Sequence, residues 1–228
     1  MENNIAECNS QQKMARACFI DTEFNPRTQR VWQIAILDSD MEPIVVAIID
    51  NDGEPHQRVT QHIEHNIRLG PVRRLSPAQF ALALKECDGL RSTDILVEWS
   101  KSNCDERGLK TTLLQGGLSP FAVTAIVPQD ENFINLLSLP KKYPGQIVPF
   151  NSWALEVVFG YLFTQHLLIS YYHEAYTDTT KLCIIPSVLI QLRKSPERRI
   201  YPGSFLRNLV EYLRDLNQSS RRRLIIAP

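Results

Sequence analysis

Two acidic residues near the start of the chain have the spacing of a metal-binding pair. Asp21 and Glu23 are separated by one residue and follow the apolar run at 17–20. Side chains two residues apart on a strand project to the same face, so a strand here would hold both carboxylates side by side. Adjacent carboxylates repel each other unless a cation neutralises them, and Mg²⁺ and Mn²⁺ prefer oxygen ligands. The pair predicts a divalent-metal site, and two solvated acids at a frayed strand end are the alternative.

A second group of candidate residues lies much later in the chain, where a helix is predicted to begin. His173 precedes or enters its first turn, and Asp178 follows about one and a half turns later. Asp178 could bind a cation while His173 takes a proton from a water molecule. Taken alone, the segment is better explained as a capped helix with a surface histidine. Only its combination with the first pair makes it a functional hypothesis.

The hydrophobic pattern predicts a mixed α/β domain that would position these residues. Three strands joined by short turns suggest an antiparallel meander, and helices and strands then alternate. The predicted strands are 15–24, 31–38, 44–49, 95–99 and 122–127. The predicted helices are 78–87, 105–114, 152–168, 175–192 and 203–216, with a kink or division at Pro186 and a loop at 140–149.

Composition narrows the class of protein. The chain has 228 residues, 43% hydrophobic and 22% charged, which suits one α/β domain with its own core. A net charge of zero argues against a generally basic nucleic-acid-binding protein.

The five cysteines are odd in number and form no C-x-x-C pair, so neither a disulfide framework nor a structural zinc site is predicted. The polar N-terminus shows no secretory signal, which favours an intracellular protein, cytoplasmic or nuclear and not secreted. The apolar stretch 153–172 contains polar residues and is predicted to be core, with no association with a membrane.

In order and spacing, the two acidic motifs resemble the DEDDh family of 3′→5′ exonucleases, which includes ribonuclease T, oligoribonuclease and proofreading exonuclease domains. The resemblance rests on segments 19–24 (FIDTEF), 33–36 (QIAI) and 173–178 (HEAYTD), and it covers roughly residues 15–195. The sister group has tyrosine where Glu174 stands, so the histidine branch is favoured. The resemblance implies an α/β fold with a ribonuclease-H-like mixed sheet and flanking helices at 14–200. A flexible lead-in at 1–13 would precede it, and an amphipathic helix and basic tail at 201–228 would follow.

The family also has an aspartate between the two motifs, after a strand and at the start of a helix. Asp105 fits that place, although Ser100-Lys101 and Cys104 stand where the family often has a His-Asn pair and an aromatic residue. Glu98 is the alternative if Asp105 points away. The resemblance implies that two Mg²⁺ or Mn²⁺ ions roughly 3.5–4 Å apart are held by four carboxylates, with His173 as general base on the attacking water. The four metal ligands would be Asp21, Glu23, Asp105 and Asp178.

The activity implied by the resemblance is hydrolysis of the terminal phosphodiester at a free 3′ end, releasing nucleoside 5′-monophosphates. The substrate would be single-stranded RNA or DNA, with RNA slightly favoured, and a homodimer is left open because several family members are dimers. Phe24 or Trp32 could stack on a terminal base, although core packing explains each better. The alternative function is a catalytically degenerate ribonuclease-H-fold protein that binds nucleic acid or serves as a scaffold. In that case the helix at 203–216 and the basic run at 219–223 would bind a partner.

Overall fold

A computed structural model gives the fold of this chain. It describes residues 16–25, 28, 30–51, 73–86, 90–99, 103–136, 154–163, 166–170 and 174–192, without the side chains at 131, 161–162, 167, 170 and 187–192. Several expectations concern residues outside these ranges. They are the lead-in at 1–13, the loop at 140–149, the segment 201–228 and the general base His173.

Within the described residues, a six-stranded mixed sheet forms the centre of the protein, in the order β4-β3-β2-β1-β5-β6. The first three strands form the predicted antiparallel meander, whereas β5 runs parallel to β1, β6 parallel to β5 and β4 parallel to β3. The predicted mixed α/β architecture is therefore confirmed. The strands are β1 (Ala17–Phe24), β2 (Val31–Asp38), β3 (Pro43–Ile49), β4 (Arg73–Leu75), β5 (Ile95–Glu98) and β6 (Phe133–Asn135).

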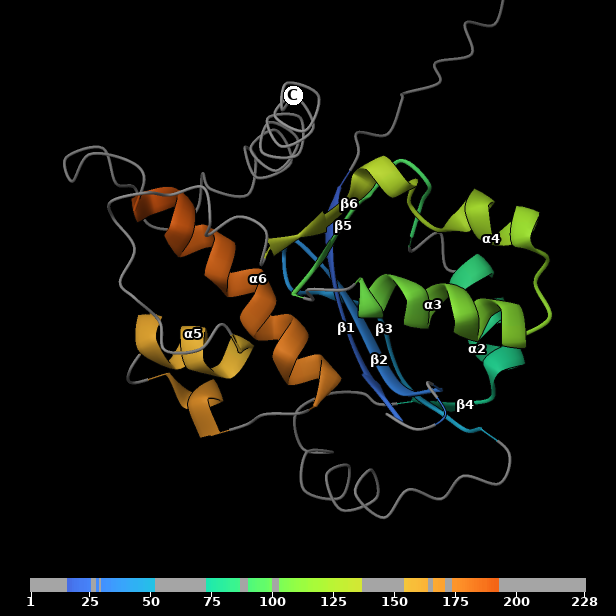
Figure 1. Cartoon of the computed structure of the whole chain (residues 1–228), viewed down its shortest axis with the longest axis horizontal. Helices are drawn as coiled ribbons and strands as arrows, with labels where there is room; N and C mark the ends of the chain where they lie inside the picture. The colour runs from blue at the N-terminus through green and yellow to red at the C-terminus, as the bar shows by residue number, and fades with distance from the viewer. Residues whose placement is uncertain are drawn as a thin grey trace, which may run out of the picture.

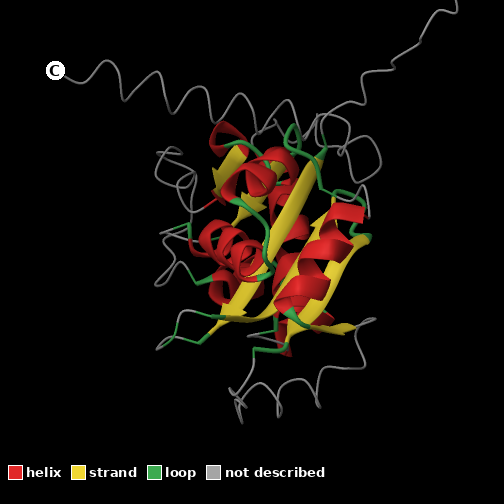
Figure 2. Ribbon diagram, turned by 90° about the vertical axis from the view of Figure 1, so that its right-hand side faces the viewer, coloured by secondary structure: helices red, strands yellow, loops and turns green. Residues whose placement is uncertain are grey.

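Helices cover both faces of the sheet. In Figure 1, α5 (Leu155–Leu162) and α6 (Ala175–Leu192) lie to the left of the strands, and α2 (Pro77–Glu86), α3 (Cys104–Gln115) and α4 (Pro120–Ile126) lie to the right. Figure 2 turns the right-hand side toward the viewer and shows helices in front of the strands. Two short 3₁₀ turns, η2 (Asp130–Asn132) and η5 (Leu167–Ser170), complete the described helical segments. None of the described helices is both long enough and apolar enough to cross a membrane.

Alternation of side chains along β1 divides the core into two layers. Phe19 is fully buried in the layer that includes Leu182 of α6, and Ile20 is fully buried in the layer that includes Leu109 of α3. Both faces of β1 are thus covered, which explains its near-continuous apolar sequence. The odd-numbered residues of β1 face α6 and the even-numbered residues face α3. This division decides where the acidic residues at the end of the strand point.

The segment 122–127 corrects one prediction, because it is not a strand: it lies in helix α4, and its last residue, Val127, is the C-cap. The side chain of Ser119 caps this helix by accepting a hydrogen bond from the Ala122 N–H at 3.2 Å, and Pro120 occupies the first turn. The same pair of residue types, Ser76-Pro77, begins α2, where Ser76 and Gln79 form a capping box. A short apolar run suits either a strand or a helix, and the Ser119-Pro120 start accounts for the helix.

Three further differences concern short or divided elements. Strands β4 and β6 were not predicted, because three residues are too few to show a pattern. The helix expected at 152–168 is shorter: α5 ends at Leu162, and η5 begins at Leu167. In contrast, α6 has the predicted limits and runs through Pro186 without division.

Candidate metal centre

The candidate site lies beside a gap in the sheet, next to the central strand β1. The pairing of β1 with β5 ends at Phe19 and Val97, yet β1 continues to Phe24. On its β5 side, the second half of β1 therefore has no strand partner among the described residues. Ligands of α/β sheets bind at the carboxyl ends of the parallel strands, where such a gap opens. Helix α3, which follows β5, begins at this edge.

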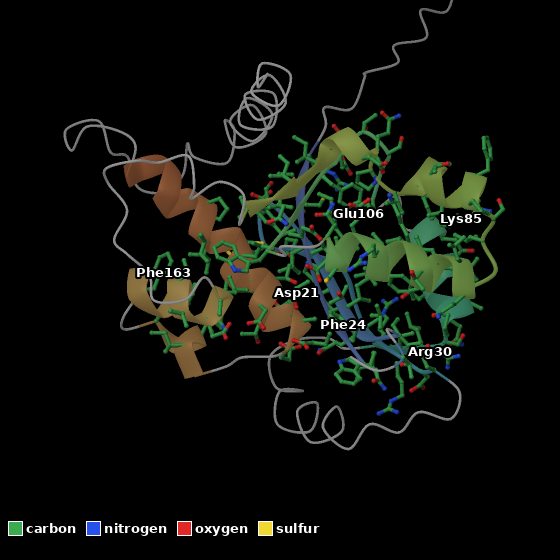
Figure 3. The ribbon with its side chains drawn as sticks, viewed as in Figure 1. Asp21, Phe24, Arg30, Lys85, Glu106 and Phe163 are labelled. Atoms are coloured by element: carbon green, nitrogen blue, oxygen red, sulfur yellow. The ribbon has the colours of Figure 1, made fainter. Side chains whose placement is uncertain are left out.

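Three predicted site residues meet where α6 crosses the sheet. Asp21 and Glu23 continue the odd-numbered row of β1 toward α6, and Asp178 lies in the first turn of that helix. One ligand oxygen from each of the three lies within 4.8 Å of the others. Figure 3 labels Asp21 in the middle of the molecule, between α6 and the helices of the opposite face. Asp178 is buried, whereas Asp21 and Glu23 are partly exposed to solvent.

Asp105 approaches the same part of β1 from the start of α3. Its Oδ1 accepts hydrogen bonds from the Thr22 N–H at 2.9 Å and from the Thr22 hydroxyl at 2.7 Å. Thr22 is the even-numbered residue between Asp21 and Glu23, so Asp105 fills the gap beside β1 and does not point away. Burial raises the pKa of Asp105 to about 6, against the opposing effect of the Thr22 hydrogen bonds. Asp105 lies next to the three carboxylates but outside the group within 4.8 Å.

Glu98, the alternative to Asp105, occupies a different position. It is the last residue of β5, and its Oε2 accepts a hydrogen bond from the backbone N–H of Glu106 at 3.2 Å. This contact gives the first turn of α3 an acceptor for one of its N–H groups that lack an intrahelical partner. Burial and the charge of Asp105 raise the pKa of Glu98 to about 8. Glu98 thus faces α3, not the group formed by Asp21, Glu23 and Asp178.

The pKa values of the site carboxylates are raised, first by burial and then by one another's negative charge. Burial is the largest cause that raises the pKa of Asp21 well above its usual value, followed by the negative charges of Asp105 and Asp178. Burial also raises the pKa of Glu23 to about 8, again with contributions from Asp178 and Asp105. Without a cation, such groups hold protons that they would release in water. Hard oxygen donors that gather in this way match the ligand preference of Mg²⁺ and Mn²⁺, so the residues present fit such an ion.

A buried polar network fixes the helix that carries Asp178. Gln33 on β2 donates its amide to Glu174 Oε1 at 2.6 Å, and its own oxygen accepts the Ala175 N–H at 3.2 Å. The other oxygen of Glu174 accepts the Thr177 N–H and hydroxyl, each at 2.7 Å. Glu174 therefore caps α6, and Gln33 ties that cap to the sheet. Sequence reasoning gave Gln33 no role, although a polar residue inside an apolar strand was a signal.

Replacement of Gln33 by leucine tests this anchor. We expect Gln33→Leu to lower the free energy of unfolding by about 2–4 kcal/mol, because a buried glutamate and a backbone N–H both lose a partner. Urea denaturation followed by circular dichroism would measure the loss. Gln79→Leu is the matched control, since Gln79 is exposed and only completes the capping box of α2. Equal effects of the two substitutions would contradict the anchoring role.

Lys181 is a site residue that sequence reasoning missed. It lies three residues after Asp178 on α6, and its Nζ is 2.8 Å from Asp178 Oδ1. The side chain is fully buried. Its spacing was the available signal, because residues three apart on a helix are neighbours. Only the tertiary structure reveals that this ion pair is buried.

Two other candidate residues, His173 and Phe24, remain to be placed. His173 immediately precedes the cap Glu174 but lies outside the described residues, so its place remains a prediction. Phe24 is packed against the core layer on the α3 side, which favours the core role for this ring.

Comparison of the chain with models of known protein families and with curated protein sequences gives no match. Any function of this protein must therefore be inferred from the motifs and from the geometry of the site.

Proposed function

We propose that this protein is a metal-dependent 3′→5′ exonuclease that hydrolyses single-stranded nucleic acid to nucleoside 5′-monophosphates. One observation carries the proposal: Asp21, Glu23 and Asp178 come from distant parts of the chain and place ligand oxygens within 4.8 Å of one another. Asp105 adds a fourth carboxylate through its hydrogen bonds to Thr22. The two motifs that carry the DEDDh resemblance thus meet in one place.

The sheet supports a ribonuclease-H-like assignment for the domain at 14–200. An antiparallel meander precedes β5 and β6, which are added in parallel on the far side of β1. This order makes β1 the central strand, with the acidic residues at its carboxyl end. Fold alone does not define an activity, so the exonuclease assignment depends on the acidic residues.

The four carboxylates would hold Mg²⁺ or Mn²⁺, and their combined charge matches two divalent ions. Bound ions would supply Lewis acidity and a lowered pKa for water. Asp105 is the better middle ligand, because it reaches β1 whereas Glu98 binds the start of α3. We assign proton transfer to His173, which comes two residues before the start of α6 in the sequence. RNA is slightly favoured as the substrate on the resemblance alone.

A catalytically degenerate binding or scaffold protein is the second candidate function. The ion pair between Lys181 and Asp178 favours it, because an ammonium group already neutralises one of the three clustered carboxylates. Binding of Mn²⁺ separates the two candidates. A centre that retains its function would gain thermal stability from the ion, and a degenerate centre would not.

The decisive experiment uses the purified full chain and single-stranded RNA and DNA labelled at the 5′ end. With Mn²⁺ we expect a ladder that shortens from the 3′ end, and with EDTA we expect intact substrate. A second substrate with a blocked 3′ terminus should resist degradation, because attack requires the free end. Internal cleavage of the blocked substrate, or no cleavage of either strand, would contradict the proposed function.

A further inference from the structure

Lys181 occupies an uncommon environment for a lysine. The residue has no exposed surface, and its Nζ lies 2.8 Å from Asp178 Oδ1. Lysine side chains are rarely fully buried unless they are paired, because an ammonium group loses its hydration. The partner here is one of the three carboxylates whose oxygens converge within 4.8 Å. The charge of Lys181 therefore acts directly on the centre.

We propose that Lys181 is a resident counter-cation that sets how many divalent ions the acidic centre binds. In the resting protein, one ion binds tightly and a second binds only weakly. Lys181 is a positioning residue in this scheme, because it acts through Asp178 and contacts no substrate. The inference rests on the proposed metal-dependent function and deepens it.

The balance of charges supports this asymmetry. Asp21, Glu23, Asp105 and Asp178 together carry four negative charges when ionised. Two divalent ions would neutralise all four, but the ammonium group of Lys181 adds one positive charge. Counted over these five groups alone, one ion leaves one negative charge and a second ion leaves one positive charge. The negative charge of Glu174 also acts on Asp21 and Glu23, but it is the same with and without the lysine. At each number of bound ions, Lys181 therefore makes the centre one unit more positive than it would be without the lysine. Charges separated by a few ångströms inside a protein interact several times more strongly than in water, so the second ion is disfavoured.

Geometry points the same way as charge. Oδ1 of Asp178 accepts a hydrogen bond from the ammonium group of Lys181. An ion that needs that oxygen must compete with a fully buried ammonium group at 2.8 Å. Within the described residues, no lysine or arginine forms an ion pair with Asp21 or Glu23. The first ion is thus expected on the side of β1.

Isothermal titration of the metal-free full chain with Mn²⁺ tests the inference without an activity measurement. We expect one tight and one weak site in the unaltered protein. Lys181→Met keeps the length and the apolar stem but removes the charge, so the second ion should bind on the order of tenfold more tightly or better. Electron paramagnetic resonance of the titrated Mn²⁺ should then show a coupled pair of ions at lower concentrations.

Two further variants serve as a substitute for Lys181→Met and as a control. Lys181→Gln retains a hydrogen-bond donor for Asp178 without the charge, in case Lys181→Met unfolds the protein. Lys110→Met is the matched control, because Lys110 is also ion-paired, with Glu106 at 2.6 Å and Asp130 at 2.9 Å, but not with the three carboxylates. Lys110→Met should leave the number and the affinity of the Mn²⁺ sites unchanged.

The outcomes separate this inference from the proposed function. Identical Mn²⁺ titrations of the unaltered chain and both Lys181 variants would overturn the inference and leave the exonuclease assignment intact. If the role of Lys181 were purely structural, its replacement would lower the melting temperature without changing the number of bound ions, and this result would also overturn the inference. Absence of Mn²⁺ binding in every protein, the unaltered chain included, would overturn the inference together with the metal-dependent function.

Discussion

Replacement of Asp21 by asparagine is expected to reduce exonuclease turnover on the order of a thousandfold, while the fold remains intact. Burial, followed by the charges of Asp105, Asp178 and Glu23, raises the pKa of Asp21 well above its usual value, so this carboxylate interacts with each of the other proposed ligands. A neutral amide of the same shape would bind a divalent cation less strongly. The expected loss corresponds to about 4 kcal/mol of transition-state stabilisation. Single-turnover assays with labelled single-stranded RNA would measure it.

The same substitution should raise the melting temperature of the metal-free protein at pH values above neutrality. The reason is that the folded state then no longer confines a negative charge among three others. Asp40→Asn is the matched control, since Asp40 is an exposed turn residue and should alter neither activity nor stability. Full turnover in Asp21→Asn would remove this residue from the mechanism, and loss of the folded state would show that its role is structural.

Rising pH is expected to destabilise the metal-free protein. The pKa of Glu23 and that of Glu98 are raised to about 8 in the folded state, and that of Asp105 to about 6. Between the unfolded values near 4 and these folded values, the folded chain binds more protons than the unfolded chain. Stability is therefore fully present at pH values below the unfolded pKa values and declines as pH rises toward about 8. Thermal denaturation in EDTA should show a fall on the order of 5 °C or more across that window.

Mn²⁺ should reverse this trend, because the ion stabilises the ionised carboxylates and replaces the protons. At a concentration a hundred times its dissociation constant, a ligand adds about 2.7 kcal/mol of stability. Glu23→Gln should flatten the pH dependence in EDTA and weaken the response to Mn²⁺, whereas Asp40→Asn should change neither. Stability that increases between pH 5 and 8 without metal would show that the carboxylates are not perturbed as the structure indicates.

Local rules were sufficient wherever one segment carried the whole signal. The apolar run that ends in Asp21 and Glu23 predicted a buried strand with both acids on one face, and β1 has that form. The capping residues Ser76 and Gln79 lie within one turn, so the start of α2 could be predicted. The limits of α6 followed from its sequence for the same reason. The strand predicted at 122–127 was wrong, because its apolar run suits both structures and the Ser119-Pro120 start favours a helix.

Contacts between distant segments decided the rest. The sequence by itself determined which acids are available and that Asp21 and Glu23 share a face, because strand alternation is a local property. The family resemblance implied that Asp178 and Asp105 join them. The contacts that bring Asp178 beside them, join Asp105 to Thr22 and tie Glu174 to Gln33 come from the tertiary structure, since each depends on where α3 and α6 cross the sheet. The spacing of Lys181 and Asp178 was visible in the sequence. The burial that gives this ion pair its influence on the centre comes from the packing of α6 against β1 and β2, which no local pattern encodes.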